Sequence, residues 1–116
     1  MVPGADTVLS HLRRGALEYC VLALMADEDR YGLDLARELT RDGVLMSGEG
    51  TLCPLLARLR KAGWVTTTWQ ESAGGPPRRY YSLTLDGRDA LEAFGPAWKQ
   101  FRDAVDAALV TGGDAR

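Results

Sequence analysis

Histidine and cysteine are scarce in this sequence of 116 residues, which contains one histidine and two cysteines. Two thiols are too few for the disulfide framework that stabilises many small secreted domains, so Cys20 and Cys53 are expected to be reduced. With His11 they form a weak set of metal ligands that scattered carboxylates would have to complete. The scarcity predicts a protein without a cofactor and leaves a metal-responsive protein as an alternative.

Long apolar runs are missing as well. No segment approaches the roughly 20 consecutive apolar residues that cross a bilayer, and the first residues, MVPGADTV, lack the pattern of a signal peptide. With 46% hydrophobic and 26% charged residues, the composition is that of a soluble protein with one modest core. These features predict a cytoplasmic protein.

The residue sets of common catalytic sites are also absent. The sequence has no supported Ser/His/Asp or Cys/His arrangement, no glycine-rich phosphate loop and no paired carboxylates in an evident pocket. An enzyme is therefore not expected.

Neither sign of charge is in large excess, since the net charge is −2, but the charges are unevenly distributed. Between Arg58 and Arg88 basic residues outnumber acidic ones, whereas between Asp27 and Asp42 the balance is reversed. Phosphates respond to the local field and not to the net charge, so the basic segment is a candidate binding region.

Three short helices are predicted in the first half of the chain. Apolar spacing places the first from an N-cap at Ser10 to Met25 and the second from Leu33 to Arg41. The third begins between Ser47 and Thr51 and ends near Ala62. Its apolar stripe is Leu52, Leu55, Leu56 and Leu59, which leaves the opposite, partly basic face exposed.

A β-hairpin is predicted next. Residues 64–70 are β-branched and aromatic, residues 78–83 alternate, and the glycine- and proline-rich segment 71–77 between them is expected to be a mobile loop. Alternation places Tyr80 and Tyr81 on opposite faces, so one of them faces the core, but the sequence does not say which.

A long last helix is predicted from Thr84, a favourable N-cap. Its apolar residues follow a heptad spacing that is typical of a helix-pairing seam: Leu91, Phe94, Trp98, Phe101, Val105 and Ala108. Gly95–Pro96 should bend the helix or open it locally.

Three small helices, a hairpin and a final helix predict a mainly α fold of the α+β class. The order is that of a winged helix-turn-helix, with a two-stranded β wing and a long C-terminal dimerisation helix. We expect residues 10–84 to form the DNA-binding domain and 85–110 the dimerisation helix, with flexible termini at 1–9 and 111–116.

Four stretches resemble the PadR family of bacterial transcriptional regulators: LEYCVLALM, YGLDLARELT, SGEGTLCPLLARLRKAGWV and GGPPRRYYSLTLDGRDAL. The likeness covers almost everything from Leu12 to about Phe101 and fits the short branch, which has a single C-terminal helix. It implies a homodimer that binds a palindromic operator in double-stranded DNA, usually as a repressor, and that in some members is released by a small effector. Cys53 departs from the tyrosine that is common at this position, which puts a DNA contact there in doubt.

The candidate site residues follow from this interpretation. The DNA-binding set is Thr51, Cys53, Pro54, Arg58, Lys61, Arg78, Arg79 and Tyr80. The dimer interface is Leu91, Phe94, Trp98, Phe101 and Val105, and a planar aromatic effector would bind at Phe94, Trp98 and Phe101. Alternatives are a metal- or redox-responsive regulator of the same fold, through Cys53 for redox, and a winged helix that binds an acidic protein partner.

Overall fold

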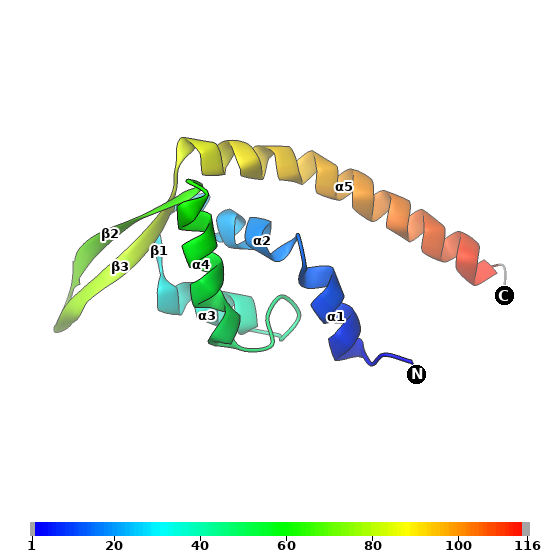
Figure 1. Cartoon of the computed structure of the whole chain (residues 1–116), viewed down its shortest axis with the longest axis horizontal. Helices are drawn as coiled ribbons and strands as arrows, with labels where there is room; N and C mark the ends of the chain where they lie inside the picture. Colours follow the sequence, from blue (N-terminus) through cyan, green and yellow to red (C-terminus); the bar gives the residue numbers. More distant parts are fainter. Residues whose placement is uncertain (1, 115–116) are drawn as a thin grey trace.

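A computed structural model describes residues 2–114 of the chain and shows mainly helices with one small sheet (Figure 1). The elements in order are α1 (Ala5–Arg13), α2 (Leu17–Leu24), β1 (Arg30–Tyr31), α3 (Gly32–Thr40), the 3-10 turn η1 (Glu49–Thr51), α4 (Leu52–Lys61), β2 (Val65–Ser72), β3 (Gly75–Leu83) and α5 (Leu85–Asp114). The predicted order of helices, hairpin and long helix is confirmed, as is the α+β winged-helix class.

The first predicted helix is two helices. α1 begins at Ala5, with Gly4 and not Ser10 as its N-cap, and the chain turns between Arg13 and Leu17 before α2 starts. Gly15 lies in this turn with a φ of 81°, a backbone conformation that residues with a Cβ avoid. The apolar spacing continues across the turn, which is why the sequence pattern alone predicted one helix.

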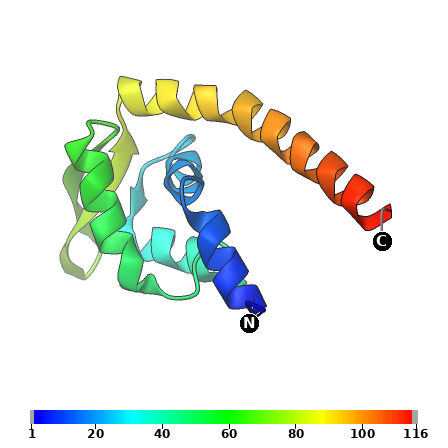
Figure 2. The same ribbon diagram turned by 45° about the vertical axis from the view of Figure 1, so that its right-hand side comes forward.

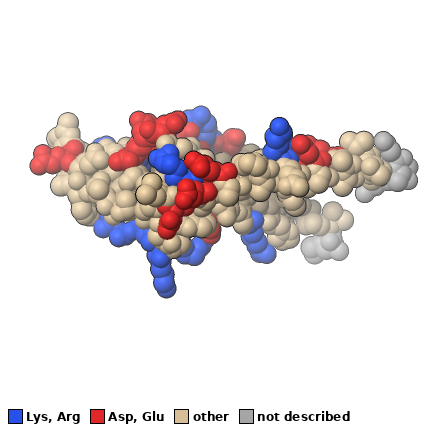
Figure 3. Space-filling view, turned by 90° about the horizontal axis from the view of Figure 1, so that it is seen from above, with Lys and Arg blue, Asp and Glu red and all other residues tan. Residues whose placement is uncertain are grey.

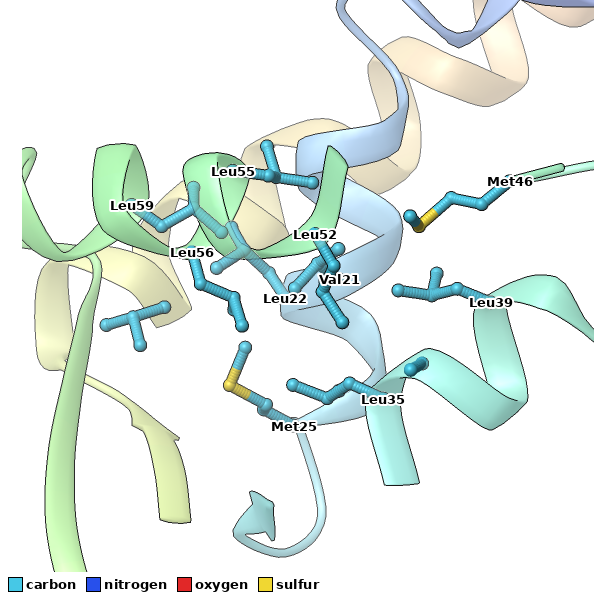
Figure 4. Packing of buried hydrophobic residues seen from close by; sticks show 12 residues of the cluster. Val21, Leu22, Met25, Leu35, Leu39, Met46, Leu52, Leu55, Leu56 and Leu59 are labelled. Atoms are coloured by element: carbon cyan, nitrogen blue, oxygen red, sulfur yellow. The ribbon is translucent and has the colours of Figure 1, made fainter. Parts of the chain in front are cut away.

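The core lies between α2, α3 and α4, where apolar side chains from the three helices interlock with Met46 from the loop before η1 (Figure 4). All four leucines of the predicted α4 stripe are buried. The buried set is Val21, Leu22, Met25, Leu35, Ala36, Leu39, Met46, Leu52, Leu55, Leu56, Leu59 and Val65. Among the described residues no polar or charged side chain is buried, so the core is held by apolar packing. This packing fixes α4 with its other face toward solvent.

The sheet has three antiparallel strands in the order β1-β3-β2, one strand more than the predicted two. β1 is only two residues long and pairs Arg30 with Tyr81 and Tyr31 with Tyr80. The contacts of β3 show which of its two tyrosines faces the core. Tyr81 packs against the core, whereas Tyr80 lies on the other face beside the Tyr31 ring, with the ring centroids 5.6 Å apart.

The expected long loop of the hairpin is a short turn. The strands extend to Ser72 and from Gly75, so most of the segment 71–77 belongs to them. Pro76 and Pro77 have no N–H to donate, but they fit in β3 because β1 pairs only with Tyr80 and Tyr81. Beside the prolines, the edge of β3 that faces away from β2 therefore needs no hydrogen-bond donor. The register with β2 is irregular between Gln70 and Ser72, opposite the prolines.

α5 starts at a joint with α4 and β2. The Thr84 hydroxyl accepts a hydrogen bond from the Gly87 N–H (3.0 Å), which confirms Thr84 as the N-cap, and it donates to the Gly63 carbonyl (2.5 Å). The Thr84 N–H also donates to the Trp64 carbonyl (3.1 Å). A Cβ on Gly87 would lie 2.0 Å from the same carbonyl oxygen, so only glycine fits there.

From this joint α5 passes over α2 and projects beyond the rest of the chain (Figures 1 and 2). The helix curves but continues through Pro96, so the expected local opening is not seen. It also continues to Asp114, past the expected end at residue 110. Of the termini expected to be flexible, residues 1, 115 and 116 lie outside the described residues.

Candidate nucleic-acid interface

The outward face of α4 carries most of the predicted DNA-binding residues. Thr51, Cys53, Pro54, Arg58 and Lys61 are all exposed, because the leucines between them face the core. Pro54 is the third residue of the helix, where its missing N–H costs no helical hydrogen bond. Thr51 occupies the N-cap position, but its side chain makes no capping hydrogen bond, so this hydroxyl is available for another partner.

Arg58 is paired. Its Nη2 donates to Glu18 Oε1 at 3.2 Å, and this ion pair joins α4 to α2 across 40 residues of sequence. Both side chains remain partly in water, with 63% of the Arg58 side chain and 36% of the Glu18 side chain exposed. Glu18 was not predicted from the sequence as a site residue, because only the packing of α2 on α4 brings the two groups together.

The two wing arginines, Arg78 and Arg79, are held on aromatic rings. The Arg78 guanidinium lies 4.6 Å from the centre of the Tyr31 ring, and that of Arg79 lies 4.8 Å from the centre of the Trp69 ring. Successive residues of a strand point to opposite faces, so the wing presents one arginine on each side. Stacking on a ring limits the rotamers of both side chains, so they are better ordered than arginines beside a mobile loop would be.

A polar hollow of about 550 Å³ lies between the end of α4 and β2. Its lining includes two basic side chains, Arg60 and Lys61, and two hydroxyl groups, those of Thr66 and Thr67. Lys61 was selected from the sequence, whereas the other three were not. The run of basic residues that ends α4 was a signal for this hollow in the sequence. A helix C-terminus favours cations, and the next strand begins only a few residues later, so basic side chains and the strand are expected to lie close together.

The charges are unevenly distributed on the surface. Seen from above, several Lys and Arg side chains project from the lower edge, where little red is seen, whereas the upper edge and the middle carry Asp and Glu side chains together with further basic ones (Figure 3). The lower edge is therefore locally basic although the net charge is −2.

The apolar face of α5 divides into two parts. Leu91 packs against the core of its own chain, and Phe94 stacks on Tyr19 of α2 with centroids 4.5 Å apart and planes 5° from parallel. Trp98 continues this stack at 6.1 Å from Phe94 and is 43% exposed, and Phe101 is 63% exposed. The first half of the seam is thus covered by the chain itself, and the second half is not.

A groove of about 750 Å³ runs between α1 and the uncovered part of α5. Leu9 and Leu12 of α1 line one side, Trp98, Phe101 and Val105 of α5 line the other, and Cys20 lies in its wall. Burial raises the pKa of the Cys20 thiol above its usual value. The Phe94, Trp98 and Phe101 set predicted from the sequence is therefore brought together at one groove.

Neither a metal-binding cluster nor a membrane-spanning helix is found in the described part of the chain. No three of the described His, Cys, Asp or Glu side chains are grouped closely enough to bind a metal ion. None of the described helices combines the length and hydropathy needed to cross a membrane.

The fold and this surface define a winged helix-turn-helix protein, with α4 as the exposed helix and β2–β3 as the wing. The chain belongs to the transcriptional regulator PadR-like family, whose model matches residues 21–93. The resemblance stated from the sequence motifs is thereby confirmed, and the protein is a PadR-family transcriptional regulator.

Individual relatives agree with this assignment. The chain is 36% identical over 83 residues to the transcriptional regulator Rv3488 of Mycobacterium tuberculosis, which covers 72% of this chain and 76% of the relative. It resembles the crystal structure of a PadR-like transcriptional regulator from Bacillus cereus with a TM-score of 0.77 and 33% identity, over 85% of this chain and 96% of that one. Bacillus subtilis PadR, solved in complex with operator DNA, shares the fold with a TM-score of 0.61 at 20% identity, over 68% of this chain and 46% of that one.

Proposed function

We propose that the protein is a sequence-specific transcriptional repressor that binds a palindromic operator in double-stranded DNA as a homodimer. The observation that carries the proposal is the exposed face of α4 beside a basic wing, in a chain of the PadR-like family. A helix of this size fits the major groove, which is about 12 Å wide, and a β-ribbon beside it reaches the neighbouring backbone.

The proposed DNA contacts fall into two groups, those to the groove and those to the phosphate backbone. Arg58 and Lys61 point outward from a rigid helix and are assigned to the groove, with Cys53 and Pro54 nearer its start. The wing arginines and Tyr80 are assigned to the phosphate backbone beside it. Thr51 has a free hydroxyl at the start of α4, where backbone N–H groups and the helix dipole also favour a phosphate.

A second copy of the chain is the proposed occupant of the groove between α1 and α5. The large apolar side chains that α5 exposes beyond Ala97, namely Trp98, Phe101, Val105, Leu109 and Val110, form a surface that favours burial. Docking the partner's α5 there covers this surface by a two-fold arrangement in which each α5 fills the other chain's groove. Leu91 and Phe94 support the interface from beneath, since they fix α5 on its own chain.

A planar, mostly apolar effector is proposed to bind in the same region. The stack of Tyr19, Phe94 and Trp98 ends in an exposed ring on which a flat molecule can lie. Such a ligand would separate the two α5 helices and change the distance between the two copies of α4, which couples binding to release of DNA. The competing arrangement is that the two Trp98 rings pack on each other and leave no cavity.

The test is selection of duplexes from a random DNA library by the purified protein, followed by sequencing and footprinting. We expect a palindrome whose half-sites lie on one face of the duplex, about 34 Å or one helical turn apart. Binding to the selected duplex should weaken steeply with salt, because released counterions drive the association.

Matched variants sharpen this test. Lys61→Ala should weaken operator binding, whereas Lys99→Ala, which removes another exposed lysine, from α5, should leave it unchanged. Failure to enrich any duplex, together with a shallow salt dependence, would contradict the proposal and favour a winged helix that binds an acidic protein.

A further inference from the structure

The ion pair between Glu18 and Arg58 places a carboxylate beside a cation that is assigned to DNA. The two groups are 3.2 Å apart, and both line a hollow of about 610 Å³ between the α1–α2 turn and the start of α4. Thr51 and Pro54, on the DNA-facing side of α4, line the same hollow. The carboxylate therefore stands at the border of the surface on which a polyanion is proposed to lie.

We propose that Glu18 is a positioning residue that raises the discrimination between operator and random DNA by holding Arg58. This inference rests on the proposed function of α4. A free arginine has many rotamers and reaches phosphates on any sequence. Pairing with Glu18 keeps the guanidinium on the α2 side of α4, so that a phosphate must compete with a carboxylate for it.

The competition acts differently on the two kinds of DNA. On random duplexes binding depends almost entirely on phosphate contacts, so the loss of one cation from that set weakens it directly. On the operator α4 is also fixed by contacts to base edges, and an arginine whose direction is already set loses less entropy when it binds. Glu18 thus lowers the affinity for random DNA more than the affinity for the operator.

The experiment compares the parent with Glu18→Gln, which keeps the side-chain shape and removes the charge. The probes are the duplex selected from the random library and a scrambled duplex of the same length and composition. The matched control is Glu38→Gln, which removes one charge from the Glu38–Arg41 ion pair on α3. Both variants change the net charge equally, so a difference between them comes from position.

We expect Glu18→Gln to bind the scrambled duplex about threefold to fivefold more tightly at low salt, with a slope of log K against log salt steeper by about 0.9. Operator affinity should change less than twofold, so the ratio of the two affinities falls. In an Arg58→Gln background Glu18→Gln should have no effect beyond that of the control, because the effect passes through Arg58. The ion pair is partly exposed, so the melting temperature should hardly move.

The outcomes separate the two levels of the argument. If the parent binds duplex DNA but Glu18→Gln behaves like Glu38→Gln, or if the ratio of affinities is unchanged, the role of Glu18 is overturned and the proposed function stands. If the parent shows no binding to duplex DNA that weakens steeply with salt, the proposed function itself fails, and this inference fails with it.

Discussion

Replacing Gly87 with alanine tests the joint between α5 and the winged-helix domain. The added Cβ would lie 2.0 Å from the Trp64 carbonyl oxygen and 2.9 Å from its carbon, and both are backbone atoms that no rotamer change can move. The two backbones are also tied together by the hydrogen bond from Thr84 N–H to the Trp64 carbonyl. Relief of the clash therefore requires α5 to move away from β2.

The magnitude follows from these contacts. Overpacking costs about 1–3 kcal/mol, and weakening of the Thr84 hydrogen bond adds about 1 kcal/mol. The better helix propensity of alanine returns about 0.5–1 kcal/mol. The net loss of about 1–3.5 kcal/mol corresponds to a fall in melting temperature of roughly 4–28 °C, at about 4–8 °C per kcal/mol for a small domain.

The assay is thermal unfolding followed by circular dichroism at one fixed protein concentration, because the proposed dimer would give a melting temperature that depends on concentration. The control is Gly112→Ala, which adds the same methyl group to the exposed far part of α5, where nothing lies within 4 Å of the new Cβ. The control should melt at or slightly above the parent temperature. If Gly87→Ala also melts within about 2 °C of the parent, the close approach does not exist as described.

Four other predictions concern the surface. Phe101→Asp combined with Val105→Asp should give monomers in analytical ultracentrifugation, because it places charges in the apolar groove, and a double variant that stays dimeric would count against that interface. Alanine at both wing arginines should weaken operator and random duplexes to similar extents and reduce the salt slope, whereas a loss restricted to the operator would assign them to bases. A thiol reagent at neutral pH should label Cys53 fast and Cys20 slowly, because Cys53 is exposed and burial raises the pKa of Cys20; equal rates would refute this difference. Planar aromatic compounds should quench tryptophan fluorescence in the parent but not in Trp98→Phe, and quenching that persists would exclude the effector site.

Local sequence patterns predicted most of the elements, and interactions distant in sequence account for most of what they missed. The leucine stripe of α4 and the Thr84 cap depend on residues within one or two turns, and the structure has both. β1 is two residues long and forms only by pairing with residues about 50 positions later, so no local pattern could reveal it. The turn at Gly15 was missed for a different reason, because a glycine within an apolar repeat is compatible with one helix or two.

In the candidate site, too, local patterns predicted some features, and interactions distant in sequence determine the others. Exposure of Arg58 and Lys61 followed from the helical period, as did the approach of Phe94 to Trp98. The rings beneath the wing arginines depend on strand register, and the partner of Arg58 depends on how α2 packs. The sequence therefore predicted the residues of the surface better than the contacts that orient them.

The helix α5 is an arm that is anchored only along its first half. Hydrogen bonds from Thr84 tie its start to Gly63 and Trp64, the residues that connect α4 to β2, and Leu91 and Phe94 pack the following turns on the same chain. At 1.5 Å per residue, the 16 residues from Lys99 to Asp114 extend about 24 Å farther, so a bend of about 10° displaces the far end by about 4 Å, which exceeds the rise of one base pair. In the proposed homodimer, small changes in the angle between the two α5 helices would alter which spacing of half-sites the pair can span. Operator spacing and sensitivity to a ligand would then be set by the same mechanical element, and lengthening or shortening α5 by whole turns offers a way to change one property through the other.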